Sequence, residues 1–325
     1  MSYSPSAPRL RIDVNDPTNQ PLSESSRFAE RAEELGFTGV GMPDHPRTGR
    51  DMFVRLALAA QRTTRVTLFP SVTNPVSRGP RMLATLGATL GELVPGRARL
   101  VVSSGKAAVE YVEGARATAS QVAGAVETII RTLADEFAPV APVPVYINAS
   151  SPMMLAAAGA AADGVYAMVG VDPEVQAQAM AHVEAGACKA GRNMDSIAVA
   201  LGLPVFMAES QERAYESASE YALFNLQNRN KVFSKVLRER IPALAEAADA
   251  SDLSSAQLCH LIDAMVVSGT PQKAAARVLS MAERAVTRHF IARVELAGED
   301  PFQAIEAFSS ALYAIGGEGV LHPGD

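Results

Sequence analysis

Polar side chains follow directly after several short apolar runs of this sequence, at the points where strands would end. Asp13 follows "LRI", and the pair Asp44 and His45 follows "GVGMP". A carboxylate at Asp13 could orient a substrate or exchange a proton, or it could pair with a neighbouring side chain. His45 is the best general acid or base in the chain because imidazole titrates near neutral pH, although the pair could also simply begin the next helix. Asp13 and His45 are therefore the predicted catalytic residues.

A third run, "RVTLF", leads into "PSVTNP" at residues 70–75. The β-branched and aromatic residues suit a packed strand and account for the first half of this stretch. Asn74 and Pro75 are common turn residues, so a plain turn is one interpretation of the second half. The other is a binding role for the residues that end the strand, which are Ser71, Val72, Thr73 and Asn74.

Two further turns have the composition of phosphate-binding loops. Small residues that lead into a helix expose backbone N–H groups, and a lysine adds a positive charge. The first turn comprises Ser103, Ser104, Gly105 and Lys106. The second, Ser150 and Ser151 before Pro152, is predicted first to cap a helix and second to contact a phosphate or a ring.

Strand-like and helix-like runs alternate along the chain. A helical run such as "SRFAERAEELG" places Phe28, Ala29, Ala32 and Leu35 on one face. Strand, helix and strand in repetition indicate parallel strands joined by crossover helices. Eight strands are predicted at 10–14, 39–43, 65–72, 97–104, 143–149, 164–170, 197–208 and 289–296.

Eight such units favour an α/β protein of the (β/α)₈ TIM barrel class over an open doubly wound sheet, since no GxGxxG follows the first strand. The span 209–288 interrupts the alternation with several helical runs, and we interpret it as a helical excursion between strands 7 and 8. The prediction is one domain over residues 1–325. In such a barrel the polar strand ends converge at one mouth, which is where an active site is expected.

Composition excludes several classes of function. The formal net charge is −6, and no dense Lys/Arg run is present, which argues against nucleic acid and membrane surfaces as partners. The N-terminal stretch lacks the pattern of a signal peptide, so a cytoplasmic location is expected. Cys188 and Cys259 are isolated and the five histidines are scattered, so neither a disulfide nor a metal site is predicted.

Taken together, these stretches resemble the bacterial luciferase-like superfamily, and within it the methylenetetrahydromethanopterin reductase branch. The resemblance spans most of the chain in order and is weakest over 209–265. It is carried by "AERAEELGFTGVGMPDH" (29–45), "SVTNPVSRGP" (71–80), "ELVPGRARLVVSSGKA" (92–107), "PVYINASSPMMLAAAGAAADGV" (144–165) and "VVSGTPQKAAARV" (266–278).

The resemblance implies a barrel that binds the deazaflavin coenzyme F420, or alternatively FMN, at the carboxyl ends of its strands. In this family a non-prolyl cis peptide bond backs the cofactor ring, and the matching bond here is Ser71–Val72. Thr73 and Asn74 match ring-contacting positions, and Ser103 to Lys106 match the loop near the cofactor's phosphate. Asp13 and His45 match the acidic residue after the first strand and the histidine after the second.

The sequence departs from the family pattern in both predicted phosphate loops. Family members usually have Gly-x-Gly after the fourth strand, where this chain has "VVSSGK". They commonly have Ser-Gly-Pro-Lys after the fifth, where this chain has "SSPM". Met153 therefore stands where a lysine is common, and the usual grip on the phosphate is changed.

The predicted function is an oxidoreductase that transfers a hydride from reduced F420 or a flavin to a small organic substrate, with His45 and Asp13 managing the substrate's proton. One alternative is a monooxygenase that uses reduced FMN from a partner flavin reductase. Another is a flavin-binding barrel without catalysis, suggested by the changed phosphate loops. The resemblance also implies a homodimer.

Overall fold

The computed structural model describes residues 10–17, 20–226, 231–245, 247 and 250–321 of the chain. Within these residues the strands form one parallel sheet in the order β3-β2-β1-β9-β7-β6-β5-β4, with β8 paired to β7 beside this path. The strands are β1 (Arg11–Asn15), β2 (Gly39–Met42), β3 (Thr67–Pro70), β4 (Leu100–Val102), β5 (Val145–Ala149), β6 (Gly164–Ala167), β7 (Ala198–Met207), β8 (Val267–Gly269) and β9 (His289–Leu296).

The sheet curls into a nearly closed barrel. Its two edge strands, β3 and β4, meet through isolated bridges between Leu68 and Ala98 and between Thr73 and Val102. Eight parallel strands with helices between them form the predicted (β/α)₈ TIM barrel, and this prediction is confirmed.

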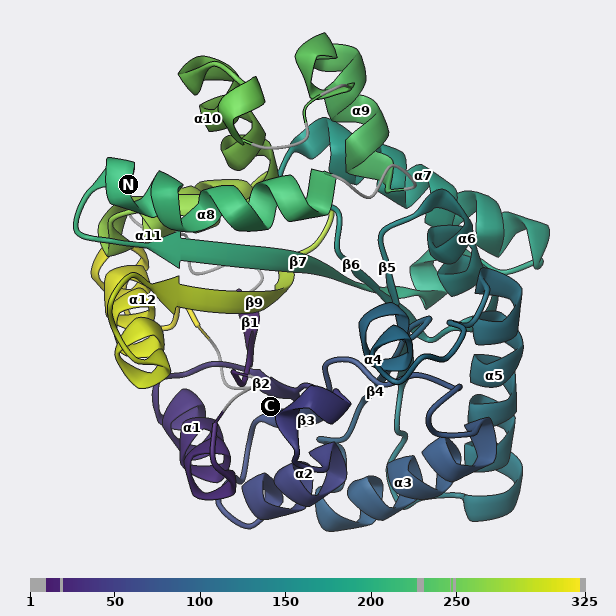
Figure 1. Ribbon diagram of the computed structural model, residues 1–325. Helices are drawn as coiled ribbons and strands as arrows, with labels where there is room; N and C mark the ends of the chain where they lie inside the picture. The colour runs from purple at the N-terminus through teal and green to yellow at the C-terminus, as the bar shows by residue number, and fades with distance from the viewer. Residues whose placement is uncertain (1–9, 18–19, 227–230, 246, 248–249, 322–325) are drawn as a thin grey trace.

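Helices surround the barrel, and Figure 1 shows α8, α9 and α10 gathered on one side of it. The α-helices are α1 (Leu22–Glu34), α2 (Met52–Ala60), α3 (Pro80–Leu93), α4 (Lys106–Tyr111), α5 (Ala119–Thr132), α6 (Pro152–Ala161), α7 (Pro173–Lys189), α8 (Gln211–Leu226), α9 (Val232–Arg240), α10 (Ser255–Met265), α11 (Pro271–Ala282) and α12 (Pro301–Gly316). Short helical turns are η1 (Pro46–Thr48), η2 (Leu133–Phe137), η3 (Met194–Ser196), η4 (Pro242–Ala245) and η5 (Ala250–Asp252).

The span 209–288 is the predicted helical excursion, and it also contains a strand that the sequence did not predict. Strand β8 has three residues, "VSG", and pairs in parallel with the last three residues of β7. Three residues are too few to show a two-residue periodicity in the sequence. Strand β8 is therefore recognised only by its hydrogen-bonded pairing with β7.

The hydrophobic core has two parts because successive residues of a strand face opposite sides of the sheet. One face packs against the surrounding helices. The other fills the barrel with a smaller cluster: Phe69, Val101, Tyr146, Tyr166, Ala200 and Ile291. This filled interior closes the barrel below its mouth, so a ligand of the barrel is expected where the strands end.

Candidate functional site

A cavity of about 590 Å³ lies at the carboxyl ends of the strands. It is lined by residues that end β1, follow β2 and β3, and belong to the long strands β7 and β9. They include Asn15, Asp16, Pro43, Ser71, Phe206 and Arg293. A cavity of this size fits a cofactor ring or a small substrate.

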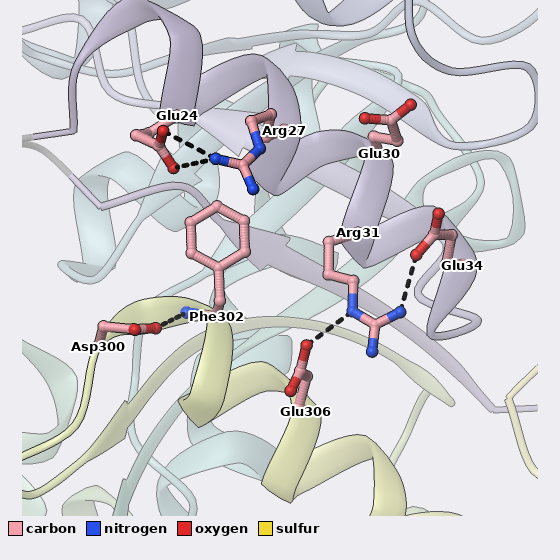
Figure 2. Close-up of a pocket in the computed structure, with 8 residues that line it drawn as sticks. All are labelled: Glu24, Arg27, Glu30, Arg31, Glu34, Asp300, Phe302 and Glu306. Atoms are coloured by element: carbon pink, nitrogen blue, oxygen red, sulfur yellow. Dashed lines mark hydrogen bonds and ion pairs between the residues drawn. The ribbon is translucent and has the colours of Figure 1, made fainter.

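A second hollow of about 530 Å³ lies outside the barrel, between α1 and α12. Figure 2 shows that its charged groups engage one another: Arg31 lies between Glu34 and Glu306, with nitrogen–oxygen distances of 2.7 Å to each. Asp300 caps the start of α12 through the N–H of Phe302. The groups in this groove stabilise the packing of two helices, and we place the functional site at the barrel mouth.

The structure corrects the predicted position of Asp13. Strand β1 continues to Asn15, so Asp13 lies inside the barrel and is fully buried rather than at the strand end. Its carboxylate accepts hydrogen bonds from Arg99 Nη1 and His289 Nε2 at 2.8 Å each, and from Thr38 Oγ1 at 2.7 Å. These three partners stand at the beginnings of strands, away from the mouth. We therefore infer that Asp13 is a structural residue.

This buried cluster is held in one charge state. Burial opposes the ionised carboxylate, but His289 and the Arg99 guanidinium hold the pKa of Asp13 well below its usual range. Burial lowers the pKa of His289, and the neighbouring Asp13 carboxylate opposes this shift. The Arg99 guanidinium also lies 4.8 Å from the ring centroid of Phe69 and 5.0 Å from that of Tyr146. The cluster thus joins β1 to the beginnings of β2, β4 and β9 and positions two rings below the mouth.

The polar residues at the true end of β1 are Asn15 and Asp16, which the sequence reading missed. Asn15 Oδ1 is buried and has no hydrogen-bond partner among the described residues. Asp16 is fully buried against Arg55, with 2.5 Å between Oδ2 and Nη2. Its Oδ1 has no hydrogen-bond partner in the part of the chain that the structure describes. Burial raises the pKa of Asp16, which Arg55 opposes. The string "VND" after Asp13 could have revealed Asn15. Side chains alternate along a strand with a period of two, so Asn15 lies on the same face as Asp13.

The end of β3 forms the wall beside Asn15. The Ser71–Val72 peptide bond is cis, as the resemblance implied. Gly41 of the neighbouring strand lies against this wall: an added Cβ would come within 2.5 Å of Asn15 Oδ1 and 2.7 Å of Ser71 Cβ. Only glycine at position 41 leaves room for the side chains of Asn15 and Ser71.

Thr73 and Asn74, the next two predicted cofactor residues, are both buried and hydrogen-bonded within the protein. Thr73 Oγ1 donates to Asp44 Oδ2 at 2.7 Å. Asn74 Oδ1 accepts from the N–H groups of Val76 and Ser77, which forms a turn. They therefore shape the wall from behind, and the direct lining of the cavity in this stretch comes from Ser71.

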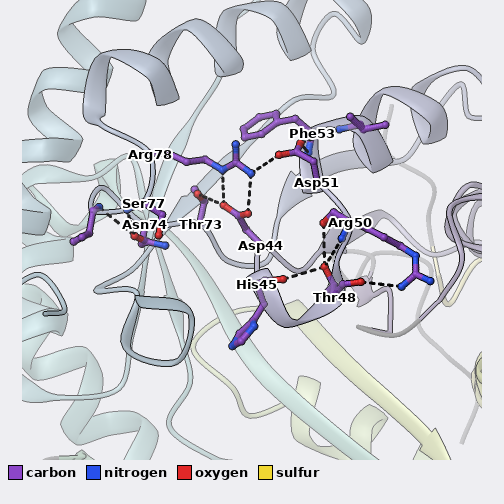
Figure 3. Close-up of polar contacts among 12 residues, drawn as sticks. Asp44, His45, Thr48, Arg50, Asp51, Phe53, Thr73, Asn74, Ser77 and Arg78 are labelled. Atoms are coloured by element: carbon purple, nitrogen blue, oxygen red, sulfur yellow. Dashed lines mark hydrogen bonds and ion pairs between the residues drawn. The ribbon is translucent and has the colours of Figure 1, made fainter. Parts of the chain in front are cut away.

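Asp44 and Arg78 join the loops that follow β2 and β3 (Figure 3). Arg78 Nε donates to Asp44 Oδ2 at 2.9 Å, and Arg78 Nη2 donates to Asp44 Oδ1 at 3.0 Å and to Asp51 Oδ2 at 2.7 Å. The hydrogen bond to Asp44 raises the pKa of Arg78 still further above its ordinary range. Asp51 in turn caps α2 through Phe53 N, and Arg78 lies over the Phe53 ring. This ion-pair network fixes the segment that carries His45.

His45 is half-buried and points away from that network (Figure 3). Its Nδ1 accepts a hydrogen bond from Arg47 N at 3.1 Å, so in the neutral ring the proton is on Nε2. The ring lies 5.5 Å from that of Tyr111 on α4. Pro43, two residues earlier, lines the cavity. His45 thus offers a hydrogen-bond donor, Nε2–H, at the edge of the mouth.

The two predicted phosphate loops lie next to each other at the ends of β4 and β5. Ser103 Oγ donates to the carbonyl of Asn148 at 3.0 Å, and Ser104 O accepts from Ala117 N. Gly105 has a φ of +77°, and an added Cβ would come within 2.7 Å of the Asn74 side chain. Lys106 begins α4 and is exposed.

In the second loop, Ser151 caps α6, as its first interpretation predicted, by accepting from Met154 N. Ser150 O accepts from Val232 N at the start of α9. The structure therefore brings the residues at the ends of β2 to β5 around one mouth, and it leaves Asp13 below them. Within the described residues no group of three or more His, Cys, Asp or Glu side chains could hold a metal ion, and no helix is long and apolar enough to cross a membrane.

A family model described as luciferase-like monooxygenase matches residues 7–288. The chain belongs to this family. An F420-dependent glucose-6-phosphate dehydrogenase from Intrasporangium calvum is 32% identical over 201 residues, which are 51% of this chain and 60% of that relative. A 5,10-methylenetetrahydromethanopterin reductase from Methanolobus tindarius is 24% identical over 299 residues, with 83% and 90% of the two chains covered.

Solved structures show the same fold. A coenzyme F420-dependent tetrahydromethanopterin reductase from Methanopyrus kandleri superposes with a TM-score of 0.73 at 20% identity, over 94% of this chain and 99% of its own. An F420-dependent secondary alcohol dehydrogenase in complex with an F420-acetone adduct gives 0.74 at 18% identity, with the same shares covered. EDTA monooxygenase from Chelativorans sp. BNC1 gives 0.70 at 15%, covering 97% and 95% of the two chains. Family membership supports an oxidoreductase, whereas the likeness to these three structures shows the fold alone.

The residues at the mouth fit a flavin-type ring. Such a ring has an apolar face and an edge that carries N–H and C=O groups. Ser71, which lines the cavity at the cis Ser71–Val72 bond, offers a surface for the face. Asn15 also lines the cavity, and its buried Oδ1 has no hydrogen-bond partner among the described residues. A ring N–H or a hydroxyl of the cofactor's side chain would satisfy that acceptor, which otherwise costs stability.

Proposed function

We propose that this protein is an F420-dependent oxidoreductase that acts on a small organic substrate. The observation that carries the proposal is the cavity between Ser71, at the cis Ser71–Val72 bond, and the long strands β7 and β9. Asn15 also lines it, and its Oδ1 has no hydrogen-bond partner among the described residues. The two relatives named above are an F420-dependent glucose-6-phosphate dehydrogenase and a 5,10-methylenetetrahydromethanopterin reductase. This similarity favours the deazaflavin over FMN.

The bound deazaflavin would supply the hydride. The protein's own groups would orient the reactants, exclude water and polarise the substrate. Ser71, Val72 and Asn15 would hold the ring, with Thr73 and Asn74 as the support behind it. His45 would donate its Nε2–H to the substrate oxygen or nitrogen that gains negative charge, a role that follows from the tautomer set by Arg47 N.

This role makes His45 a hydrogen-bond donor in its neutral form. A base at the same position would need the proton on Nδ1, which would break the bond from Arg47 N. The Asp44–Arg78 pair joins the loops after β2 and β3 through two hydrogen bonds, so its role is to position the loop of His45. Cytoplasmic location and a homodimer remain predictions.

Two titrations followed by one anaerobic assay test the proposal. The purified protein is titrated with oxidised F420 and with FMN by fluorescence, and then reduced F420 is offered with a panel of C=O, C=N and C=C substrates. Tight F420 binding and substrate-dependent oxidation of reduced F420 without oxygen are expected. If the protein prefers FMN and consumes oxygen, the F420-dependent function is wrong, and the monooxygenase with a partner reductase takes its place. No binding of either ring would reject both.

A further inference from the structure

Two lysines meet beside the phosphate loops, and one of them comes from the helical excursion. Lys231 directly precedes α9, and its Nζ donates to Asn225 Oδ1 at 2.6 Å and lies 5.2 Å from the Phe233 ring centroid. Lys106 begins α4. Burial, and then the nearby charge of Lys106, lower the pKa of Lys231 to about 8. The two ammonium groups are thus close enough to repel each other.

Neither lysine forms an ion pair with a carboxylate of the described residues. In the part of the chain that the structure describes, every ion pair uses an arginine or a histidine as its cation. Among the described residues, Lys231 Nζ has the neutral amide of Asn225 as its hydrogen-bond partner. A mostly buried cation beside a like charge is unfavourable in the absence of an anion.

The surrounding contacts hold Lys231 in place. Val232 N donates to Ser150 O at 3.0 Å, which joins the start of α9 to the turn after β5. At the other end of α9, Arg240 pairs with Asp172 at 2.6 Å. Helix α9 is therefore anchored at both ends, and Lys231 sits at a fixed place next to the loop that begins α6.

The chemistry of this place suits a phosphate. Ser151 is the N-cap of α6 and accepts from Met154 N, and Pro152 at the first position has no N–H. The positive end of the dipole of this ten-residue helix lies at the same corner and favours negative charge. Met153, on the first turn of that helix, is 75% exposed and carries no charge. A cation supplied from elsewhere in the chain is therefore what this corner requires to bind an anion.

We propose that Lys231 and Lys106 together bind the phosphate ester of the cofactor's side chain, beside the start of α6. This inference rests on the proposed function, and it assigns part of the cofactor site to the helical excursion. It also accounts for the changed loops: the charge missing at Met153 is supplied by Lys231. The shared ligand chemistry is a phosphate ester, which in F420 is a diester and in FMN a monoester.

Matched ligands test the site without reference to turnover. FMN is compared with riboflavin, and F420 with its phosphate-free deazaflavin riboside, by isothermal titration of wild type, Lys231→Met and Lys231→Arg. Lys235→Met is the control because Lys235 is exposed on the same helix. We expect Lys231→Met to weaken the phosphate-bearing ligand at least tenfold and to change the phosphate-free ligand less than twofold. Lys231→Arg and Lys235→Met should stay near wild type.

The outcomes separate this inference from the proposed function. If Lys231→Met binds the phosphate-bearing ligand as wild type does, the phosphate site is wrong although the ring site stands. If no ring binds to wild type, the proposed function fails, and titration with inorganic phosphate then decides the anion site. Weak phosphate binding by wild type that is lost in Lys231→Met would support the anion site. Equal phosphate binding by wild type and Lys231→Met would overturn it.

Discussion

Arg78 holds Asp44 through two nitrogens, Nε to Oδ2 at 2.9 Å and Nη2 to Oδ1 at 3.0 Å. The two residues are 34 positions apart and lie on the loops after β2 and β3. Thr73 Oγ1 donates to the same carboxylate. The planar guanidinium therefore joins the loop that carries His45 to the wall that carries the cis bond. The positions of both segments depend on this bidentate ion pair.

Replacing Arg78 tests this dependence on the bidentate ion pair. Arg78→Lys keeps the charge but cannot reproduce two parallel hydrogen bonds, so we expect a loss of about 1–3 kcal/mol in the free energy of unfolding. Cofactor affinity should fall as well, because the loops after β2 and β3 lose their common anchor. Urea unfolding and fluorescence titration measure the two effects. Arg81→Lys is the control, since the Arg81–Glu136 pair is exposed; equal effects of the two variants would contradict the role of Arg78.

His45 should matter for turnover more than for binding. Its Nε2–H is predicted to stabilise charge that develops on the substrate, so His45→Ala should reduce the rate of hydride transfer by roughly 10²-fold or more. His45→Gln, which retains an N–H donor, should lose less. Single-turnover oxidation of reduced F420 with the substrate found in the panel measures this rate.

The control for His45 is His182→Ala on α7, away from the mouth, which should keep the wild-type rate. Affinity for oxidised F420 should stay within about threefold in both variants, because His45 contributes its hydrogen bond in the transition state. A His45→Ala protein that transfers hydride at the wild-type rate would remove His45 from the mechanism.

Much of the fold could be predicted from the sequence because the strands and helices differ in period. The apolar runs fixed the approximate places of eight strands, and the ends of the runs pointed to the mouth at Ser71, Ser103 and Ser151. The position of Asp13 could not be settled this way. A strand alternates with period two, so Asp13 and Asn15 face the same side, and an error of two residues in the strand end exchanges a buried residue for one at the mouth.

The contacts that complete the site are long-range and left no local pattern. Arg78 reaches Asp44 from another loop, and Lys231 approaches Lys106 from helices inserted much later in the chain. Asn15 was inconspicuous because an asparagine after an apolar run usually indicates a turn. Sequence reasoning found the elements that carry the site, whereas the partners became visible only when the barrel brought distant loops together.

Asp13 should contribute to stability rather than to chemistry. Asp13→Asn leaves the buried Arg99 without a carboxylate, so we expect a loss of about 3–5 kcal/mol in the free energy of unfolding. The folded-state pKa of Asp13 is depressed, so its contribution is present above the unfolded value near 3.8 and is lost as the pH falls below it. Urea unfolding between pH 3 and pH 7 should show a shallower acid loss for Asp13→Asn than for wild type.

Any variant of Asp13 that folds gives a second readout. The hydride-transfer rate of folded Asp13→Asn should remain near that of wild type, because Asp13 lies below the mouth. A wild-type free energy of unfolding combined with a rate reduced a hundredfold would restore the catalytic role that the sequence predicted for this residue.

Lys231 should give the protein an unusual dependence of stability on alkaline pH. Its pKa is lowered in the folded state from 10.5 to about 8, so between pH 8 and pH 10 the unfolded chain binds more protons at this residue than the folded one. The contribution of Lys231 to the free energy of unfolding therefore rises with pH across this window. In Lys231→Met that rise should disappear, and the variant should be more stable than wild type near pH 7. Urea unfolding of both proteins at pH 7, 8, 9 and 10 measures the difference, with Lys235→Met as the control.

A saturating phosphate-bearing cofactor should raise the pKa of Lys231 and flatten the same slope in wild type. Parallel curves for wild type and Lys231→Met in the cofactor-free proteins would show that Lys231 is an ordinary, fully hydrated lysine.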